Sequence, residues 1–284
     1  MKITLNLIFG CLIIFNSFGQ EMKIYGHRGC RGLLPENTLS SFNKAIELGV
    51  DGIEWDVVVN KENKLYISHE PYIDTSYCQL INGEKIKNKS KSSLNIYKMN
   101  KEEIEKYDCG SIYQKKFPKQ KLYEAQKPTV KEAFAELKEK NPIILFEIKS
   151  SLEDYGKYQP YPEEYCNIIK KEVENYKYLD NIIFMSFDDQ IINKLHDIMP
   201  SQRLVYLIYK PQLDTKSYLK KLDFKPFALG MYYPLISRKT IKRLHNKKIN
   251  VFAWTVNDLK KGNELEKIGL DGLITDYPNY FTKD

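Results

Sequence analysis

Short apolar segments alternate with amphipathic ones along almost all of the 284 residues, and this alternation most limits how the chain can fold. Most of the apolar segments are unbroken, as in strands that are buried on both faces of a parallel sheet. They lie at residues 23–26, 52–59, 65–68, 143–148, 181–186, 203–208, 228–232, 250–256 and 272–275. The amphipathic segments predict helices at 38–48, 129–140, 165–176, 188–198, 215–222, 237–247 and 259–268. Strands that alternate with helices in this way predict an α/β protein.

The link after the second apolar segment reduces the nine candidate strands to eight. Residues 60–64 are polar and too few to hold a crossover helix, so they predict a β-hairpin. Residues 65–68 would then return antiparallel to 52–59. Eight parallel strands remain, which predicts a (β/α)8 TIM barrel with a hairpin arm after its second strand. An open doubly wound sheet is the alternative.

Residues 71–127 interrupt the alternation and are rich in Lys, Asn and Tyr. Within them a helix is predicted at 100–107, because Asn100 is followed three positions later by Glu103, as in a capping box. We interpret the stretch as an insertion over one end of the barrel. Long insertions often serve as lids or binding loops; a solvated excursion without function is the alternative.

The first 19 residues have the three-part layout of a secretory signal peptide. Lys2 gives a basic start, residues 5–15 are almost wholly apolar, and the small residues Ser17 and Gly19 predict cleavage after Gly19. The apolar run is too short for a good transmembrane span; a buried N-terminal strand or helix is the alternative. We therefore expect an exported protein, periplasmic or secreted, with one catalytic domain over residues 20–284.

Export would allow the cysteines to form disulfides, because disulfides form in oxidising compartments. Cleavage would leave Cys30, Cys78, Cys109 and Cys166, which allow three complete pairings. None of them has the CxxC spacing of a zinc site. Cys78 and Cys109 lie in the same insertion and can pair; free thiols are the alternative.

The composition excludes several classes of protein. A mean hydropathy of −0.49, with one short apolar run, excludes a polytopic membrane protein. The 44 basic and 37 acidic residues give a net charge of +7, which by itself suits an anionic partner. The sequence has no nucleic-acid motif or basic face to support one. We expect no nucleic-acid partner and no stable membrane insertion.

Carboxylates gather at the ends of two predicted strands. Glu54 and Asp56 lie two apart, so both point to one face of the strand and Trp55 points to the other. Glu147 and Lys149 repeat this spacing on the strand at 143–148. Buried carboxylates repel one another unless a cation lies between them, and carboxylate oxygens suit Ca²⁺ or Mg²⁺. The pattern predicts one divalent cation; a salt bridge between Glu147 and Lys149 is the alternative.

Two histidines follow strands on the same side of the predicted barrel. His27 and Arg28 come directly after the first strand, at the junction that faces the active-site end. His69 ends the hairpin arm and can lie beside Asp56 if the second strand extends to about Val59. Histidine exchanges protons near neutral pH. The planar guanidinium of Arg can donate two parallel hydrogen bonds to the oxygens of a phosphate. A proton acceptor, a proton donor, a divalent cation and phosphate-binding cations suffice for phosphodiester cleavage.

Several short motifs occur in a specific order across residues 24–278. They are Tyr25-Gly26-His27-Arg28-Gly29, Leu34-Pro35-Glu36-Asn37-Thr38, Glu54-x-Asp56, His69-Glu70-Pro71, Phe146-Glu147-Ile148-Lys149, Trp254-Thr255-Val256-Asn257 and Asp271-Gly272-Leu273-Ile274-Thr275-Asp276-Tyr277-Pro278. Together they resemble the glycerophosphodiester phosphodiesterase family. The resemblance implies a TIM-barrel enzyme that hydrolyses small-molecule glycerophosphodiesters to sn-glycerol 3-phosphate and an alcohol.

The resemblance also implies a role for each candidate residue. It makes Glu54, Asp56 and Glu147 the ligands of one Ca²⁺ or Mg²⁺ ion, His27 and His69 the base and the acid, Arg28 and Lys149 the phosphate-binding cations, and Trp254 a wall of the substrate pocket. The substrate's own glycerol 2-hydroxyl would attack the phosphorus, an intramolecular step that benefits from a large effective molarity.

The sequence departs from the family pattern beside the expected acid. Glu70 stands where the family usually has Asp, and Asp74-Thr75 lacks the Arg that usually follows. Two rival functions remain open. One is a phospholipase C- or D-type barrel that acts on lysophospholipids or phosphoinositides, and the other is a non-catalytic binding barrel. The polar character of residues 71–127 favours soluble substrates over membrane lipids.

Overall fold

A computed structural model describes residues 21–87, 89–209 and 214–282 of the chain. The predicted signal peptide, residues 1–19, lies outside the described residues. Among the residues that are described, no helix has the length and apolarity to cross a membrane.

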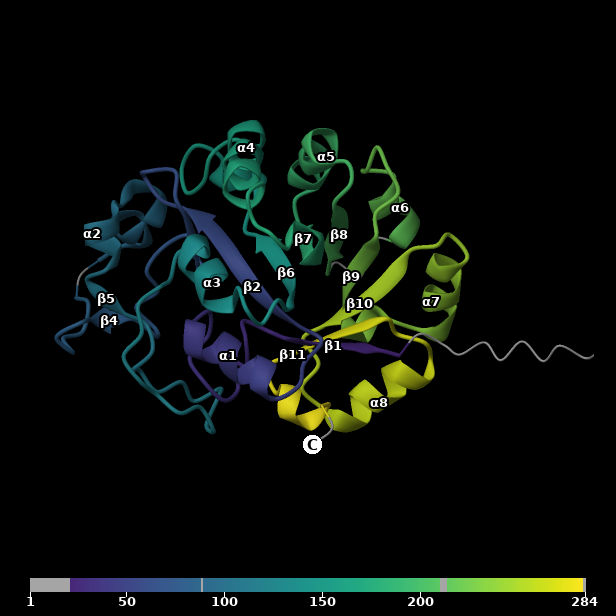
Figure 1. The fold of residues 1–284 in the computed structure, drawn as a ribbon, viewed down its shortest axis with the longest axis horizontal. Coiled ribbons are helices and arrows are strands. Elements are labelled where there is room, and N and C mark those ends of the chain that lie inside the picture. Colours follow the sequence, from purple (N-terminus) through teal and green to yellow (C-terminus); the bar gives the residue numbers. More distant parts are fainter. Residues whose placement is uncertain (1–20, 88, 210–213, 283–284) are drawn as a thin grey trace, which may run out of the picture.

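Eight parallel strands form a closed barrel (Figure 1). The barrel closes because the first strand is hydrogen-bonded both to the second and to the last. The strands are β1 (Lys23–Gly26), β2 (Gly52–Val59), β6 (Ile143–Ile148), β7 (Ile182–Ser186), β8 (Arg203–Ile208), β9 (Ala228–Tyr232), β10 (Asn250–Trp254) and β11 (Gly272–Thr275). The predicted TIM barrel is confirmed, and the alternative of an open sheet is wrong.

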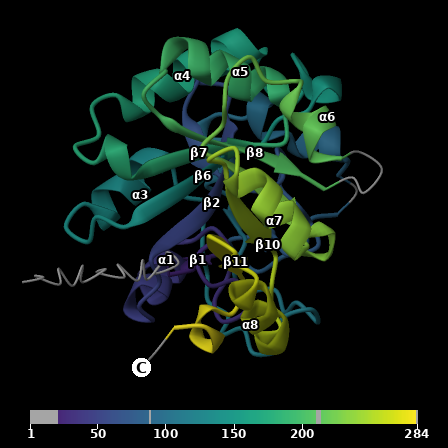
Figure 2. The ribbon, with the colours of Figure 1, turned by 90° about the vertical axis from the view of Figure 1, so that its right-hand side faces the viewer.

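Helices surround the strands on the outside of the barrel, as the two perpendicular views in Figure 1 and Figure 2 show. They are α1 (Leu39–Glu47), α3 (Val130–Leu137), α4 (Pro162–Val173), α5 (Asp189–Ile198), α6 (Thr215–Leu219), α7 (Arg238–His245) and α8 (Leu259–Lys267). All seven predicted helices are present. The third of them, α4, begins three residues earlier than the sequence predicts, because Pro162 occupies its first turn, where a missing N–H costs no hydrogen bond.

Two apolar layers lie on opposite faces of the strands. The outer layer packs strands against helices and includes Trp55, whose ring contacts Phe42, Phe134 and Phe146. A smaller cluster that includes Leu145 fills the lumen. Because side chains alternate along a strand, the outward position of Trp55 places Glu54 and Asp56 in the lumen. This confirms the predicted orientation of the two carboxylates.

The hairpin arm is also confirmed. Strand β3 (Leu65–Ile67) runs antiparallel to β2, with Val59 opposite Leu65 and Val57 opposite Ile67. The Ser68 amide then donates to the Asp56 carbonyl at 2.9 Å. The arm therefore returns toward the lumen and brings His69 to the level of Asp56, as predicted.

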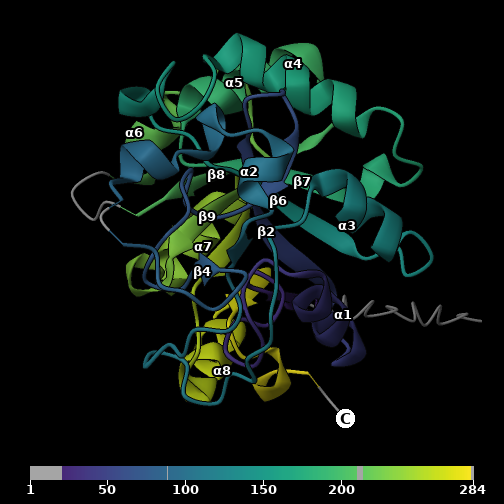
Figure 3. The same ribbon diagram turned by 90° about the vertical axis from the view of Figure 1, so that its left-hand side faces the viewer.

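The insertion, residues 71–127, packs beside β2 and faces the viewer in Figure 3. It contains α2 (Lys101–Ile104) and a two-stranded sheet of β4 (Gln79–Leu80) and β5 (Tyr107–Asp108). The Asn100 capping box is confirmed, although the helix is shorter than predicted. A second apolar core packs the insertion against β2 and β3, and it includes Val58 and Tyr66 of these strands with Ile73, Tyr77, Leu94, Ile96 and Ile104 of the insertion. A merely solvated excursion would have no such core.

A disulfide joins Cys78 to Cys109 across the insertion, and Cys30 and Cys166 are free and buried. The bond closes a loop with a sequence separation of 31. Removing it with Cys78→Ala and Cys109→Ala should lower the free energy of unfolding by about 3 kcal/mol, through the added entropy of the unfolded loop. Urea unfolding monitored by fluorescence measures this loss. Adding dithiothreitol should destabilise the wild type and leave the double variant unchanged; equal sensitivity of both would contradict the prediction.

Candidate active site

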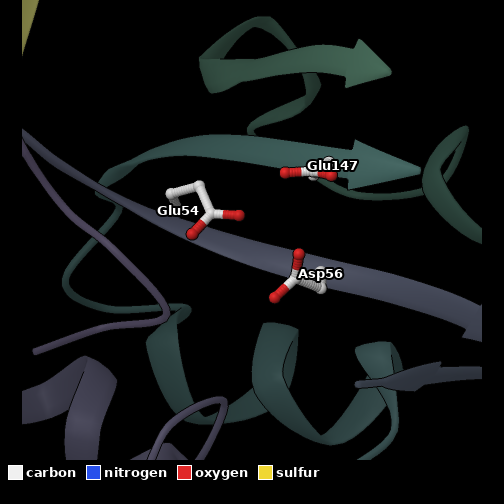
Figure 4. Close-up of side chains that lie close together, drawn as sticks. All are labelled: Glu54, Asp56 and Glu147. Carbon is white, nitrogen blue, oxygen red and sulfur yellow. The ribbon is translucent and has the colours of Figure 1, made fainter. Parts of the chain in front are cut away.

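Three buried carboxylates converge in the lumen from two neighbouring strands (Figure 4). Glu54 and Asp56 come from β2 and Glu147 from β6, and one oxygen of each lies within 4.8 Å of the others. Burial, reinforced by the charges of Asp56 and Glu147, raises the pKa of Glu54 well above its ordinary value. A bound cation would offset this repulsion.

The donor set fits a hard divalent cation. Glu54 Oε1 and Asp56 Oδ1 are buried and have no hydrogen-bond partner among residues 21–87, 89–209 and 214–282. Lys149 Nζ lies 3.5 Å from Asp56 Oδ1 and forms an ion pair with Glu147. The predicted salt bridge and the predicted acidic cluster are therefore both present. Carboxylate oxygens of this kind are typical ligands of Ca²⁺ and Mg²⁺.

Arg28 lies across one side of the carboxylate cluster. Its backbone N–H donates to Glu54 Oε2 at 2.8 Å, and its φ of 50° brings the backbone into this position. Its guanidinium donates to Glu36 at 2.7 Å and lies 3.1 Å from Asp56 Oδ2. Burial alone would raise the pKa of Asp56, but Arg28 and neighbouring cations hold it below its ordinary range. Arg28 thus orients two carboxylates of the cluster.

His27 is held by a carboxylate from the other end of the chain. Its Nδ1 lies 2.7 Å from Asp276 Oδ1, and its Nε2 lies 3.8 Å from Glu54 Oε2. The hydrogen bond assigns the proton to Nδ1 and leaves the Nε2 lone pair facing the lumen. Burial and the nearby Arg31 lower the pKa of His27 to about 4, so the ring is neutral at pH 7. A neutral, oriented imidazole suits a general base.

His69 has its own carboxylate partner, Glu70. His69 Nδ1 lies 2.6 Å from Glu70 Oε1, which leaves Nε2 free to face the lumen. The Tyr77 hydroxyl donates to the second oxygen of Glu70 at 2.7 Å. A carboxylate beside Nδ1 can balance the charge of a protonated ring.

These side chains line one cavity of about 400 Å³ at the carboxyl ends of the strands. Its polar side holds His27, Arg28, Glu54, His69, Glu147 and Lys149. Its apolar side holds Met185, Phe187, Leu207 and Trp254. The polar side of the cavity can bind a phosphate and a cation, and the apolar side can contact the hydrocarbon part of a ligand.

Comparison with known proteins agrees with this geometry. The sequence matches the Glycerophosphoryl diester phosphodiesterase family over residues 27–280. The chain belongs to this family. It is 28% identical over 265 residues to a Bacillus subtilis protein provisionally named a glycerophosphodiester phosphodiesterase, covering 93% of this chain and 98% of that protein.

Solved structures show the same fold. A Silicibacter pomeroyi protein, provisionally titled a glycerophosphoryl diester phosphodiesterase, superposes with a TM-score of 0.81 at 22% identity, over 92% of each chain. An Oleispira antarctica phosphodiesterase, solved in complex with the product sn-glycerol-3-phosphate, has a TM-score of 0.73 at 21% identity. That comparison covers 91% of this chain and 94% of the Oleispira chain.

All eight residues that the sequence singles out come together in this member of the phosphodiesterase family. Seven of them line the cavity directly, and Asp56 lies behind Arg28 and Lys149. Asp276 and Asn37 also orient site residues, although their motifs alone did not indicate this role. Asn37 donates to Asp56 Oδ2 at 2.8 Å, from a left-handed backbone position with φ of 57°. The position of Asp276 directly after the last strand is a signal that could have indicated it, because loops at that end of a TIM barrel build the site.

Proposed function

We propose that this protein is an exported, metal-dependent glycerophosphodiester phosphodiesterase that uses His27 and His69 as its base and its acid. The observation that carries the proposal is the cavity in which two carboxylate-oriented histidines flank three buried carboxylates and two phosphate-binding cations. Family membership supports the reaction class. The product complex of the Oleispira relative supports a glycerol phosphate product.

The reaction begins with the substrate's own glycerol 2-hydroxyl. His27 Nε2 takes its proton as the oxygen attacks phosphorus, and Asp276 stabilises the resulting imidazolium at Nδ1. His69 Nε2 gives a proton to the departing alcohol, whose bond to phosphorus breaks. Water then opens the cyclic phosphate with the two roles reversed, giving sn-glycerol 3-phosphate. An intramolecular nucleophile avoids the entropic cost of positioning a separate water in the first step.

The remaining site residues bind and orient the phosphodiester. Arg28 and Lys149 offer positive charge to the non-bridging oxygens, and Trp254 packs against the carbon skeleton. Glu54, Asp56 and Glu147 would hold one Ca²⁺ or Mg²⁺ ion. Such an ion supplies Lewis-acid stabilisation of charge that develops on the phosphoryl oxygens.

The test is hydrolysis of glycerophosphocholine by the protein spanning residues 20–284. We expect release of sn-glycerol 3-phosphate, loss of activity in EDTA and recovery with excess Mg²⁺ or Ca²⁺. Lysophosphatidylcholine serves as the competing substrate. Turnover of that lipid alone would assign the barrel to the phospholipase type, and activity that persists after exhaustive chelation would count against the metal. Specific binding of glycerophosphodiesters without turnover would support a binding barrel.

Export is proposed from two observations. The N-terminal layout is typical of a signal peptide, and the Cys78–Cys109 disulfide suits an oxidising compartment. When the full chain is expressed in a bacterium with a secretory pathway, mass spectrometry of the exported fraction should find a protein that begins at Gln20. A protein that keeps Met1 or the apolar run and stays in the cytosol would contradict export.

A further inference from the structure

Contacts between the insertion and the hairpin arm converge on Glu70. The carboxylate of Glu70 bridges His69 Nδ1, at 2.6 Å, and the Tyr77 hydroxyl, at 2.7 Å. Lys127 Nζ donates to the same hydroxyl at 3.3 Å and lies 5.1 Å from the centre of the Tyr77 ring. Lys127 and Tyr77 are both buried. A continuous chain of polar contacts thus runs from Lys127 through Tyr77 and Glu70 to His69.

The two residues that lead to Glu70 in this series of contacts, Lys127 and Tyr77, are each held in place by the backbone around them. Tyr77 belongs to the apolar core of the insertion, in a turn where its amide and that of Cys78 donate to the Asp74 carbonyl. Cys78 is then held by the disulfide to Cys109. Lys127 precedes Pro128, whose carbonyl accepts from the Ile67 amide of β3 at 2.8 Å. The Tyr77 hydroxyl that donates to Glu70, and the Lys127 ammonium behind it, therefore have little freedom to move.

Among these four residues, Glu70 depends most on its neighbours to hold its side chain in one conformation. A Glu side chain has one more rotatable bond than an Asp side chain, so its carboxylate loses more freedom when it is held at His69. A hydrogen bond from a buried hydroxyl to a carboxylate is charge-assisted and directional. Burial would raise the pKa of Glu70, but its bonds with His69 and Tyr77 keep it below its ordinary range, so the carboxylate stays charged.

We propose that Tyr77 is a positioning residue for the acid of the reaction: its hydroxyl holds the Glu70 carboxylate, and Glu70 holds His69 with Nε2 toward the leaving-group oxygen. The insertion thereby supplies, through Tyr77 and Lys127, the restraint that keeps the flexible Glu70 side chain at His69. This role rests on the proposed function, because it takes His69 as the proton donor to the departing alcohol.

The test compares two leaving groups in the Tyr77→Phe variant, which keeps the buried ring and removes only the hydroxyl. Choline needs a proton to depart, whereas p-nitrophenol departs readily as its anion. With glycerophosphocholine we expect kcat to fall by about tenfold, a fraction of the roughly 10²- to 10⁴-fold that a general acid contributes. With the p-nitrophenyl ester of glycerol phosphate we expect less than about a twofold change, because this step does not depend on the acid.

Two variants make the result specific. Tyr107→Phe removes a hydroxyl from β5, beside the same core, and should leave both substrates unaffected. Glu70→Gln, which keeps the length of the side chain, should show the same split between leaving groups as Tyr77→Phe. Equal losses on both substrates would show a merely structural role, and no loss on either would show no role; both results overturn the inference. A wild-type enzyme inactive on both substrates would instead overturn the proposed function.

Discussion

Replacing His27 with Gln should lower kcat for glycerophosphocholine by about 10³-fold, within the range that a general base contributes. Gln has a similar reach but cannot accept and return a proton. The fold should persist, because the lost side chain makes one hydrogen bond, to Asp276, and Arg31 still pairs with that carboxylate at 2.8 Å. Steady-state kinetics, with thermal unfolding as the check on folding, measures the effect.

The matched control for this prediction is His196→Gln. His196 lies on α5, where its ring stacks on Phe224 with centroids 3.9 Å apart, and it does not line the cavity. We expect its activity to remain within about twofold of the wild type, as for changes outside a site. A His27→Gln variant that keeps more than a tenth of the activity would show that another group accepts the proton.

Replacing Asp276 with Asn should also lower kcat, because Asp276 is the residue that orients His27. The variant keeps a polar group at 276 but loses the charge that orients His27 and stabilises its protonated form. Its loss of activity should be smaller than that of His27→Gln, and combining the two changes should add little to His27→Gln alone, because residues that act as a unit are not additive.

Replacing Glu54 with Gln should abolish tight cation binding without weakening the fold. The change removes one of three charges from the acidic cluster, so affinity for Mg²⁺ or Ca²⁺ should fall by about 100-fold or more, equivalent to about 2.7 kcal/mol. In EDTA the variant should unfold at the same temperature as the wild type or higher. Burial beside Asp56 and Glu147 raises the pKa of Glu54, which means that its charge is unfavourable in the folded chain without a cation.

Calorimetric titration measures the affinity for the cation, and thermal unfolding with and without the cation measures the stability of the fold. Wild type should gain thermal stability on adding the ion, by mass action, and Glu54→Gln should not. Glu153→Gln, a change at an exposed position, is the control and should behave as wild type. A Glu54→Gln variant that binds the ion as tightly as wild type would place the cation elsewhere.

The barrel could be predicted from the sequence because each of its strands has a recognisable local pattern of apolar residues. Unbroken apolar runs such as 203–208 are otherwise rare except in buried strands, apart from the single Arg that opens this one, and the five polar residues 60–64 are too few to hold anything but a hairpin turn. The secondary structure of the insertion was harder to predict. Its sheet of β4 and β5 has only two residues in each strand, and the pairing depends on tertiary contacts that leave no periodic pattern.

The candidate site was predictable where function depends on spacing along one strand. Glu54 and Asp56 share a face for purely geometrical reasons. Contacts between distant segments were not predictable in this way: nothing local in the sequence shows that Asp276 meets His27 or that Lys127 meets Tyr77. The motif around Glu36 and Asn37 marked its segment as important, but only the structure shows that both side chains orient groups around the carboxylate cluster.

The contact between His27 and Asp276 joins residues 249 positions apart, at the seam where β1 pairs with β11. No stretch of chain that lacks its last strand can orient this histidine. Contacts of such long separation form late, since the entropy of closing the intervening loop must be overcome first. We therefore expect enzymatic turnover to return during refolding only after the ring of strands has closed, and a chain still being synthesised to remain inactive until its final strand has paired with β1.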